Sequence, residues 1–223
     1  MNIQNKSLKN SLEFKSIDYQ LQPYTNPELI SEKGPQVFNS GSGVNVEDID
    51  GNSYIEGMSG LWCASLGFGE NELIEAAVKQ MRKLPYYHSF TGKTCEATIK
   101  LSEKLIEIAP NNLKKVFFCN SGSEANDTAI KIVWYYHSSL GNPKKRKIIS
   151  RKGSYHGVTL AAASLTALDY AQKGFGLPLD FALHTTWPHY FQNSYENESE
   201  KDFCFRLIND LEKLIEIEGA ENI

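Results

Sequence analysis

The segment 116–127 has residue types that suit the binding of an anionic group. Its first four residues are apolar and read as a buried strand, and the sequence Asn120-Ser-Gly-Ser-Glu-Ala-Asn-Asp127 follows them. Gly122 lets an anion approach the backbone closely, and Ser123 offers a hydroxyl and an N–H group where we predict a helix N-cap. The start of a helix also carries roughly half a positive charge. On its own, the segment fits a phosphate-binding turn and an ordinary capped helix equally well.

A second group of candidate residues, Tyr155 and His156, follows the apolar pair Ile148-Ile149. We expect this pair to lie in a strand and the candidates to lie at its carboxyl end. Gly153 and Gly157 flank them and permit close approach of the backbone to a ligand. Tyr155 and His156 are therefore candidate ligand contacts, although a core tyrosine and a hydrogen-bonded core histidine fit the same pattern.

The elements that would position these residues alternate between strand and helix. The pattern predicts helices over 94–109, 123–138 and 157–165, and strands over 116–119 and at 148–149. This βαβ alternation is typical of an α/β protein with a mainly parallel, doubly wound sheet. Ligands of such sheets bind at the carboxyl ends of the strands, where both candidate groups lie.

The flanking parts of the chain have different patterns. We predict a polar arm over 1–35 and a β-rich segment over 36–59, with a hairpin at Asp50-Gly51. An amphipathic helix capped by Asn71 is expected to run to Leu84. Residues 168–198 are expected to be irregular, and residues 202–218 to form an amphipathic helix.

Length and composition exclude several classes of protein. The 223 residues are 41% hydrophobic, with a net charge of −4 and a pI near 5.8, which fits a globular chain without a nucleic-acid partner. The four cysteines are widely scattered, so we expect no disulfide framework and no metal site. The sequence shows no signal peptide and no apolar run of membrane-spanning length. We therefore predict a cytoplasmic protein without a membrane partner.

Several motifs together resemble one enzyme family. The segment Asn120–Asp127 is followed by Tyr155-His-Gly-Val-Thr159 and Ala163-Ser-Leu-Thr166, in the order and spacing of the class III, pyridoxal-phosphate-dependent aminotransferases of fold type I. Ser59-Gly-Leu-Trp62 and Leu84-Pro-Tyr-Tyr-His-Ser-Phe90 resemble the ω-amino-acid:pyruvate transaminase branch. The resemblance covers residues 20–190. It implies an α/β fold of the fold type I PLP-transferase kind, incomplete here, of which the chain is the N-terminal portion.

The resemblance implies pyridoxal 5′-phosphate as the cofactor and suggests its contacts. Gly122 and Ser123 match the positions that hold the phosphate, with Ser121 beside them. Tyr155 matches the aromatic residue that stacks on the pyridine ring, and such stacking adds roughly 1 kcal/mol beyond the burial of area. His156 could orient the site or satisfy a hydrogen bond in the core.

The resemblance also implies a substrate pocket that is aromatic and apolar. Tyr24, Leu61, Trp62 and Phe90 match positions that line this pocket in the family. They come from three separate segments, as expected of a pocket built from loops. Without the resemblance, Trp62 and Phe90 would be interpreted as ordinary core aromatics.

The implied reaction transfers an amino group from an amine or ω-amino acid to a keto acid such as pyruvate. It requires a Schiff-base lysine and an aspartate that pairs with the pyridine nitrogen, and we find neither in the sequence. Lys152 is near the second candidate group but matches no Schiff-base position in the family. We therefore expect the chain to hold no catalytic residue of its own and to be inactive alone.

Two alternatives stay open at this stage. One is an aminomutase or decarboxylase of the same family, and the other is a non-catalytic half-protein that binds the cofactor or a full-length paralogue. We predict that residues 1–59 belong to the small domain and residues 60–223 to the N-terminal part of the large cofactor-binding domain. The resemblance further implies that the full-length protein is a homodimer or a higher homo-oligomer.

Overall fold

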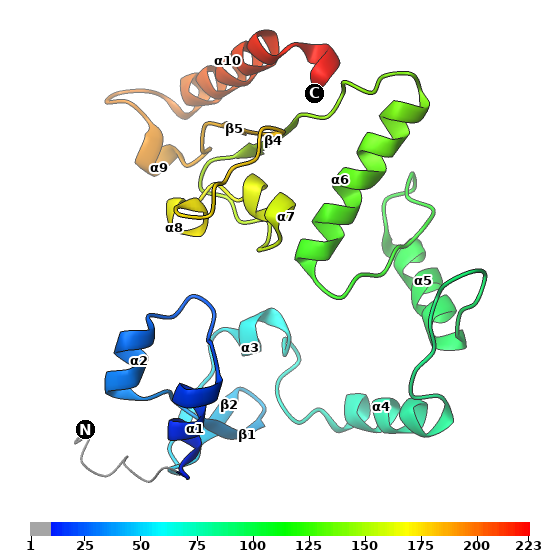
Figure 1. Cartoon of the computed structure of the whole chain (residues 1–223), viewed down its shortest axis with the longest axis vertical. Helices are drawn as coiled ribbons and strands as arrows, with labels where there is room; N and C mark the ends of the chain where they lie inside the picture. Colours follow the sequence, from blue (N-terminus) through cyan, green and yellow to red (C-terminus); the bar gives the residue numbers. More distant parts are fainter. Residues whose placement is uncertain (1–9) are drawn as a thin grey trace. The chain divides into compact units, whose positions relative to one another are not determined.

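The structure is a computed structural model that describes residues 10–223. The first nine residues of the predicted polar arm lie outside the described part. The chain consists of two compact units, Met1–Lys100 and Leu101–Ile223 (Figure 1). The predicted domain boundary after residue 59 stays a prediction.

Two short helices lie within the predicted polar arm. They are α1 (Leu12–Tyr19) and α2 (Pro27–Lys33). Ser11 accepts a hydrogen bond from the Phe14 N–H at the start of α1, and Asn26 caps α2, with Pro27 at the first helical position. The prediction of an arm did not include these helices because the polar composition obscured their capping signals.

A three-stranded antiparallel sheet forms in the segment predicted to be β-rich. Its strands, in sheet order, are β1 (Phe38–Ser42), β2 (Asn45–Asp48) and β3 (Ser53–Ile55). The predicted hairpin at Asp50-Gly51 is confirmed between β2 and β3. The Asp48 carboxylate accepts hydrogen bonds from the N–H groups of Asp50 and Asn52, which fixes the turn.

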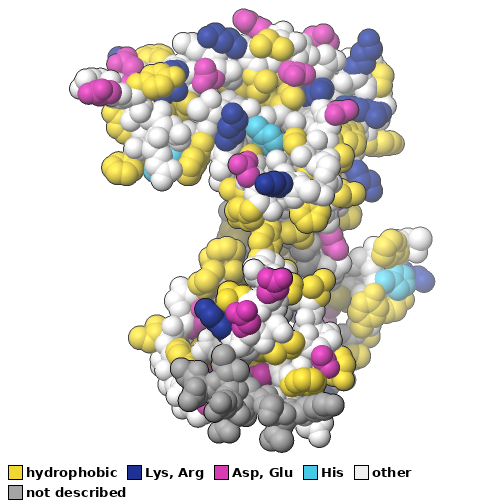
Figure 2. Space-filling model, turned by 60° about the vertical axis from the view of Figure 1, so that its left-hand side comes forward, with side chains coloured by type: hydrophobic (Ala, Val, Ile, Leu, Met, Phe, Trp, Pro, Cys, Tyr) yellow, Lys and Arg dark blue, Asp and Glu magenta, His cyan; other side chains and the backbone are white. Residues whose placement is uncertain are grey.

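The next helices are α4 (Asn71–Lys83) and α5 (Glu96–Ile108), close to the predicted ranges. Asn71 is the first helical residue rather than the N-cap, because Glu70 occupies the cap position. The Lys83 ammonium lies 2.6 Å from the Glu96 carboxylate and joins the end of α4 to the start of α5. The apolar face of α4 is exposed, including Leu73, Ile74 and Met81. Figure 2 shows many other hydrophobic side chains at the surface.

The second unit contains the βαβ arrangement that the sequence predicts. Strand β4 (Ile148–Arg151) pairs in parallel with β5 (Ala182–Thr185), with Ile148 opposite Ala182. Helix α7 (Leu160–Leu165) lies on the connection between them, followed by the short helix α8 (Asp169–Gln172). In Figure 1 the two strands run between α7 and the long helix α10 (Glu200–Glu218).

The core of this unit lies between α6 (Gly122–Ser139), α7 and the two strands. Ile130, Leu165 and Ala182 are buried there, and Trp134 packs its ring edge to face against Phe181 at 5.3 Å between centroids. These apolar contacts fix the middle of α6 relative to α7 and β5. Both candidate groups for cofactor binding therefore stand on one packed scaffold.

Three sequence predictions for this unit need correction. Residues 116–119 are not a strand, because they pair with no other strand within residues 10–223, and Phe117 is largely exposed. Residues 168–198 are not irregular throughout, since they contain α8, β5 and α9 (Tyr190–Asn193). Strand β5 was missed because its four residues, Ala-Leu-His-Thr, alternate too briefly to give a strand pattern. The helix predicted over 157–165 begins only at Leu160.

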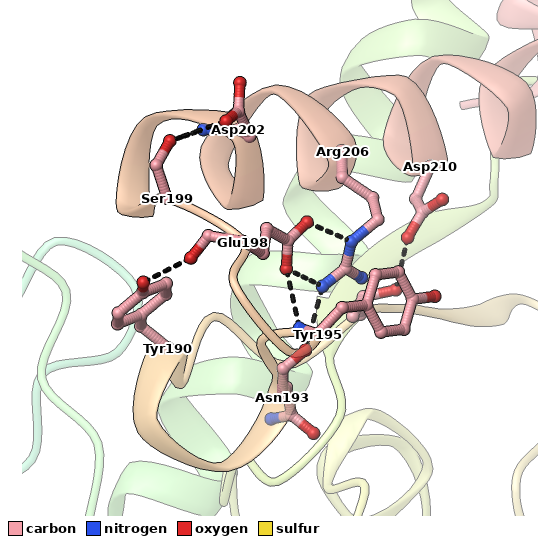
Figure 3. Close-up of polar contacts among 9 residues, drawn as sticks. Tyr190, Asn193, Tyr195, Glu198, Ser199, Asp202, Arg206 and Asp210 are labelled. Atoms are coloured by element: carbon pink, nitrogen blue, oxygen red, sulfur yellow. Dashed lines mark hydrogen bonds and ion pairs between the residues drawn. The ribbon is translucent and has the colours of Figure 1, made fainter.

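Helix α10 is held to the preceding loop by an ion pair (Figure 3). The Arg206 guanidinium donates from Nε to the Glu198 carboxylate at 2.8 Å and from Nη2 to the Asn193 carbonyl at 2.8 Å. It also lies over the Tyr195 ring, 4.1 Å from the centroid. The guanidinium lowers the pKa of Glu198 to about 2. A final 3-10 turn, η2 (Ala220–Asn222), follows α10.

Every helix within the described residues is too short or too polar to cross a membrane.

Candidate cofactor and substrate site

The N-cap of helix α6 lies two residues earlier than the sequence suggested. Ser121 is the N-cap, and its hydroxyl accepts a hydrogen bond from the Glu124 N–H at 3.1 Å. Ser123 is the second helical residue, so its assignment as the N-cap was wrong. The error arose because serines stand on both sides of Gly122, and either one satisfies the capping preference.

Two backbone donors are free at the start of α6. The N–H groups of Glu124 and Ala125 are satisfied by Ser121. Those of Gly122 and Ser123 find no acceptor within residues 10–223, as expected for the first turn of a helix. A Cβ atom at Gly122 would meet nothing within 4 Å. This helix start therefore offers two donors and open space to an oxyanion.

The Ser123 side chain has a partner already. Its residue is only 9% exposed, and its hydroxyl oxygen accepts a hydrogen bond from the Val158 N–H at 3.0 Å. The hydroxyl hydrogen is still able to donate to an anion. Ser123 therefore anchors the segment after β4 through its side chain. Its backbone N–H is one of the two free donors of the first helix turn.

Tyr155 and His156 lie on the anchored segment. The Tyr155 residue is 55% exposed, so its ring can accept a stacked partner. The backbone of His156 is held at both ends, because its N–H donates to the Thr166 hydroxyl at 2.8 Å and its carbonyl accepts from the Asn126 amide at 2.6 Å. The structure thus joins the two predicted cofactor-binding groups through hydrogen bonds between α6 and residues 156–158.

The predicted substrate residues Leu61 and Trp62 lie on a left-handed turn, α3 (Ser59–Trp62). The φ angles are 50° at Ser59, 58° at Gly60, 59° at Leu61 and 67° at Trp62. A left-handed backbone conformation costs a residue with a Cβ about 1–2 kcal/mol of conformational free energy. Such strain concentrates at functional sites. The strained backbone therefore identifies Leu61 and Trp62 as candidate functional residues, independently of their residue types.

The Glu56 carboxylate holds this turn. One of its oxygens accepts from the Met58 N–H at 2.9 Å, and the other accepts from the Gly60 N–H. The N–H groups of Gly60 and Met58 lower the pKa of Glu56 below its ordinary value. Glu56 was not among the residues predicted from the sequence, although it stands only three residues before the motif Ser59-Gly-Leu-Trp62.

The four predicted substrate residues are all exposed. The exposed fractions are 64% for Tyr24, 61% for Leu61, 76% for Trp62 and 75% for Phe90. They all belong to the first unit, where the described cavities are lined by other residues. The structure therefore presents them at the surface and does not gather them around one of these cavities.

Lys152 lies in a different place from the predicted cofactor residues. It lines a cavity of about 280 Å³ between β5 and α10, together with His184, Thr186, Asp210 and Lys213. None of the predicted cofactor residues takes part in this lining.

A model of the family described as aminotransferase class-III matches residues 30–221. The chain belongs to this family. It is 45% identical over 204 residues to gamma-aminobutyrate transaminase 1, mitochondrial, of Oryza sativa subsp. japonica, covering 91% of this chain and 40% of that protein. It is 46% identical over 194 residues to the vanillin aminotransferase of Capsicum frutescens, covering 86% of this chain and 42% of that protein.

Solved structures agree with this class-III assignment. The ω transaminase of Pseudomonas jessenii in complex with PMP matches with a TM-score of 0.94 and 51% identity, over 96% of this chain and 47% of that one. The PMP-bound aminotransferase of Vibrio fluvialis matches with a TM-score of 0.92 and 42% identity, over 96% of this chain and 47% of that one. A thermostable ω transaminase variant engineered for asymmetric synthesis of enantiopure bulky amines also matches, at 50% identity and a TM-score of 0.94 over 96% of this chain and 47% of that one.

Three conclusions follow for this class-III chain. Its fold is of the fold type I transaminase kind, as the sequence predicts. The cofactor of the family is pyridoxal 5′-phosphate, and the free donors and open space at Gly122 fit its phosphate group. The chain spans between 40% and 47% of the length of these relatives.

Proposed function

We propose that this chain supplies the phosphate-binding and ring-binding parts of a pyridoxal 5′-phosphate site in a transaminase. The observation that carries the proposal is a pair of N–H groups, on Gly122 and Ser123, that find no acceptor within residues 10–223 and stand beside open space at the start of a helix of a class-III chain. Ser121 and the hydroxyl hydrogen of Ser123 add further donors. Tyr155 supplies the flat face against which the pyridine ring stacks, and the backbone of the neighbouring His156 is fixed by its hydrogen bonds to Asn126 and Thr166.

The enzyme so formed transfers an amino group from an amine or ω-amino acid to a keto acid such as pyruvate. When bound, the cofactor supplies an electron sink for the electrons released at the substrate carbon. The residues of this chain bind the phosphate, orient the ring and exclude water from one of its faces. Relatives named as gamma-aminobutyrate, vanillin and ω transaminases support an amine-type donor.

Tyr24, Leu61, Trp62 and Phe90 form the apolar part of the substrate pocket in this proposal. The strained turn at Leu61 and Trp62 supports it. The engineered variant for bulky amines provides further support, since its substitutions include a tryptophan and a phenylalanine that are as far apart in sequence as Trp62 and Phe90. In this account Trp62 limits the size of the amine.

The 223 residues are proposed to be inactive without further protein, because no Schiff-base lysine and no aspartate for the pyridine nitrogen are identified among them. A homodimeric or larger full-length enzyme is part of the same proposal. A cytoplasmic location stays a prediction. Two relatives are named as mitochondrial and chloroplastic, which are other compartments.

Two assays test the proposal. The chain is first titrated with pyridoxamine 5′-phosphate, which has no aldehyde to react with surface lysines, and with pyridoxamine, which has no phosphate. We expect saturable binding of the first and much weaker binding of the second.

The second assay supplies the chain with pyridoxal 5′-phosphate, an amine and pyruvate, followed by borohydride reduction. We expect no sustained formation of alanine and no single trapped lysine. Sustained turnover with one trapped lysine would overturn the inactivity of the chain alone. Equal affinity for the phosphorylated and unphosphorylated ligands would overturn the phosphate site.

A further inference from the structure

Helix α6 holds the loop 155–159 and the first turn of α7 through one face. Ser123, Asn126 and Asp127 are spaced so that their side chains lie on the same side of the helix. Ser123 binds the Val158 N–H and Asn126 binds the His156 carbonyl. Asp127 makes two further contacts, one with Thr159 at the end of the loop and one with the first turn of α7.

The Asp127 carboxylate caps helix α7 from a distance in sequence. Thr159 is the N-cap of α7, but its side chain makes no capping hydrogen bond. The Thr159 hydroxyl instead donates to Oδ1 of Asp127 at 2.7 Å, and the same oxygen accepts from the Ala162 N–H at 3.0 Å. Asp127 thus takes over the role of the missing cap and ties the end of the loop to α6.

The approach of the loop to α6 is too close for any side chain at residue 157. Gly157 has a φ of 138°, and a Cβ there would lie 2.5 Å from the Ser123 hydroxyl oxygen and 2.8 Å from the Ala162 Cβ. The backbone of the loop therefore touches the helix turn that carries the free N–H donors.

From this arrangement we infer that Asp127 is a positioning residue for the cofactor ring. Its carboxylate accepts from Thr159 and Ala162 and is not among the groups proposed to contact the phosphate or the ring. It fixes the loop that carries Tyr155. The Tyr155 ring is thereby kept at a constant distance from the N–H groups of Gly122 and Ser123, which are the proposed phosphate donors. The inference rests on the proposed function and assigns a role to a residue outside the proposed contacts.

The variants separate the hydrogen bonds of Asp127 from its charge. Asp127→Ala removes both bonds, whereas Asp127→Asn keeps an oxygen acceptor of the same shape. Each is titrated with pyridoxamine 5′-phosphate and with inorganic phosphate, alone and in a Tyr155→Leu background. Inorganic phosphate reports the helix start without the ring.

We expect Asp127→Ala to weaken pyridoxamine 5′-phosphate binding by about three- to tenfold, the range of one lost aromatic stack. Inorganic phosphate binding should stay within about twofold, since the donors of α6 remain in place. Asp127→Asn should resemble the wild type. In the Tyr155→Leu background, Asp127→Ala should have almost no further effect, because both changes remove the same stacking contact.

Other outcomes distinguish the two claims. If the effects of Asp127→Ala and Tyr155→Leu multiply, or if phosphate binding falls equally, Asp127 does not act through Tyr155 and the inference is overturned while the proposed function stands. If the wild type binds neither pyridoxamine 5′-phosphate nor inorganic phosphate, both the inference and the proposed function are overturned. Should Asp127→Ala fail to fold, Thr159→Val removes one of the two bonds, and the same cycle with Tyr155→Leu applies.

Discussion

The hydroxyl oxygen of Ser123 accepts a hydrogen bond from the Val158 N–H at 3.0 Å, which joins the first turn of α6 to the loop after β4. The sequence suggested that Ser123 caps α6 and binds a phosphate. The structure gives the cap to Ser121 and gives the Ser123 oxygen to the loop. In the proposed site, Ser123 would bind the phosphate through its N–H and hydroxyl hydrogen, and it would position the ring through the loop that it anchors.

Gly157→Ala tests how closely this loop must dock. The added Cβ would overlap the Ser123 hydroxyl oxygen, so we expect a loss of about 1–3 kcal/mol in the free energy of unfolding. Gly141→Ala is the matched control, because Gly141 has a φ of 81° with nothing within 4 Å of its Cβ position. Chemical denaturation should show a larger loss for Gly157→Ala. Equal losses would mean that backbone strain alone matters at residue 157.

Much of the fold could be predicted because its signals are local. Helices α4, α5, α6 and α10 follow apolar spacing, and the hairpin follows Asp50-Gly51. Strand pairing is not local, so the apolar run 116–119 gave a false strand and the short β5 was missed. The roles of Asn126 and Asp127 depend on a loop some thirty residues away in sequence. No pattern within segment 116–127 could have indicated them.

Glu56→Ala tests the support of the left-handed turn. The pKa of Glu56 is lowered by the N–H groups of Gly60 and Met58, so its carboxylate stabilises the folded chain above the ordinary value of 4.5. This contribution disappears as the pH falls through the lowered pKa. We expect acidification to change the fluorescence of Trp62 in the wild type. In Glu56→Ala the emission should already be shifted at neutral pH and respond less to acid.

Comparison with a Trp62→Phe variant assigns the fluorescence change to Trp62. Glu56→Gln should be intermediate, because its amide can accept only one of the two hydrogen bonds. A wild-type acid response that survives unchanged in Glu56→Ala would show that Glu56 does not hold the turn.

Glu198→Gln tests the ion pair that fastens α10. The Arg206 guanidinium lowers the pKa of Glu198 from 4.5 to about 2, so the pair stabilises the folded state above pH 4.5 and loses its effect toward pH 2. We expect the variant to unfold at a lower temperature than the wild type at pH 7. This difference should shrink as the pH is lowered from 5 toward 2.

Thermal unfolding followed by circular dichroism at several pH values measures this difference. Glu196→Gln serves as a control, because it neutralises a neighbouring glutamate that is exposed. If the unfolding temperatures of Glu198→Gln and the wild type differ by the same amount at all pH values, the charge of Glu198 does not stabilise the fold.

The measurement that tests the central claim most directly is the affinity of Gly122→Asp for pyridoxamine 5′-phosphate. A carboxylate there has room, and it suits the first turn of a helix, so the fold should be retained. Its charge would face the phosphate, and we predict affinity at least about tenfold weaker than for the wild type. Gly122→Asn, of equal size without charge, should bind more tightly than Gly122→Asp, and Gly57→Asp, also in open space, should match the wild type. Wild-type affinity in a folded Gly122→Asp variant would contradict a phosphate site at the start of α6.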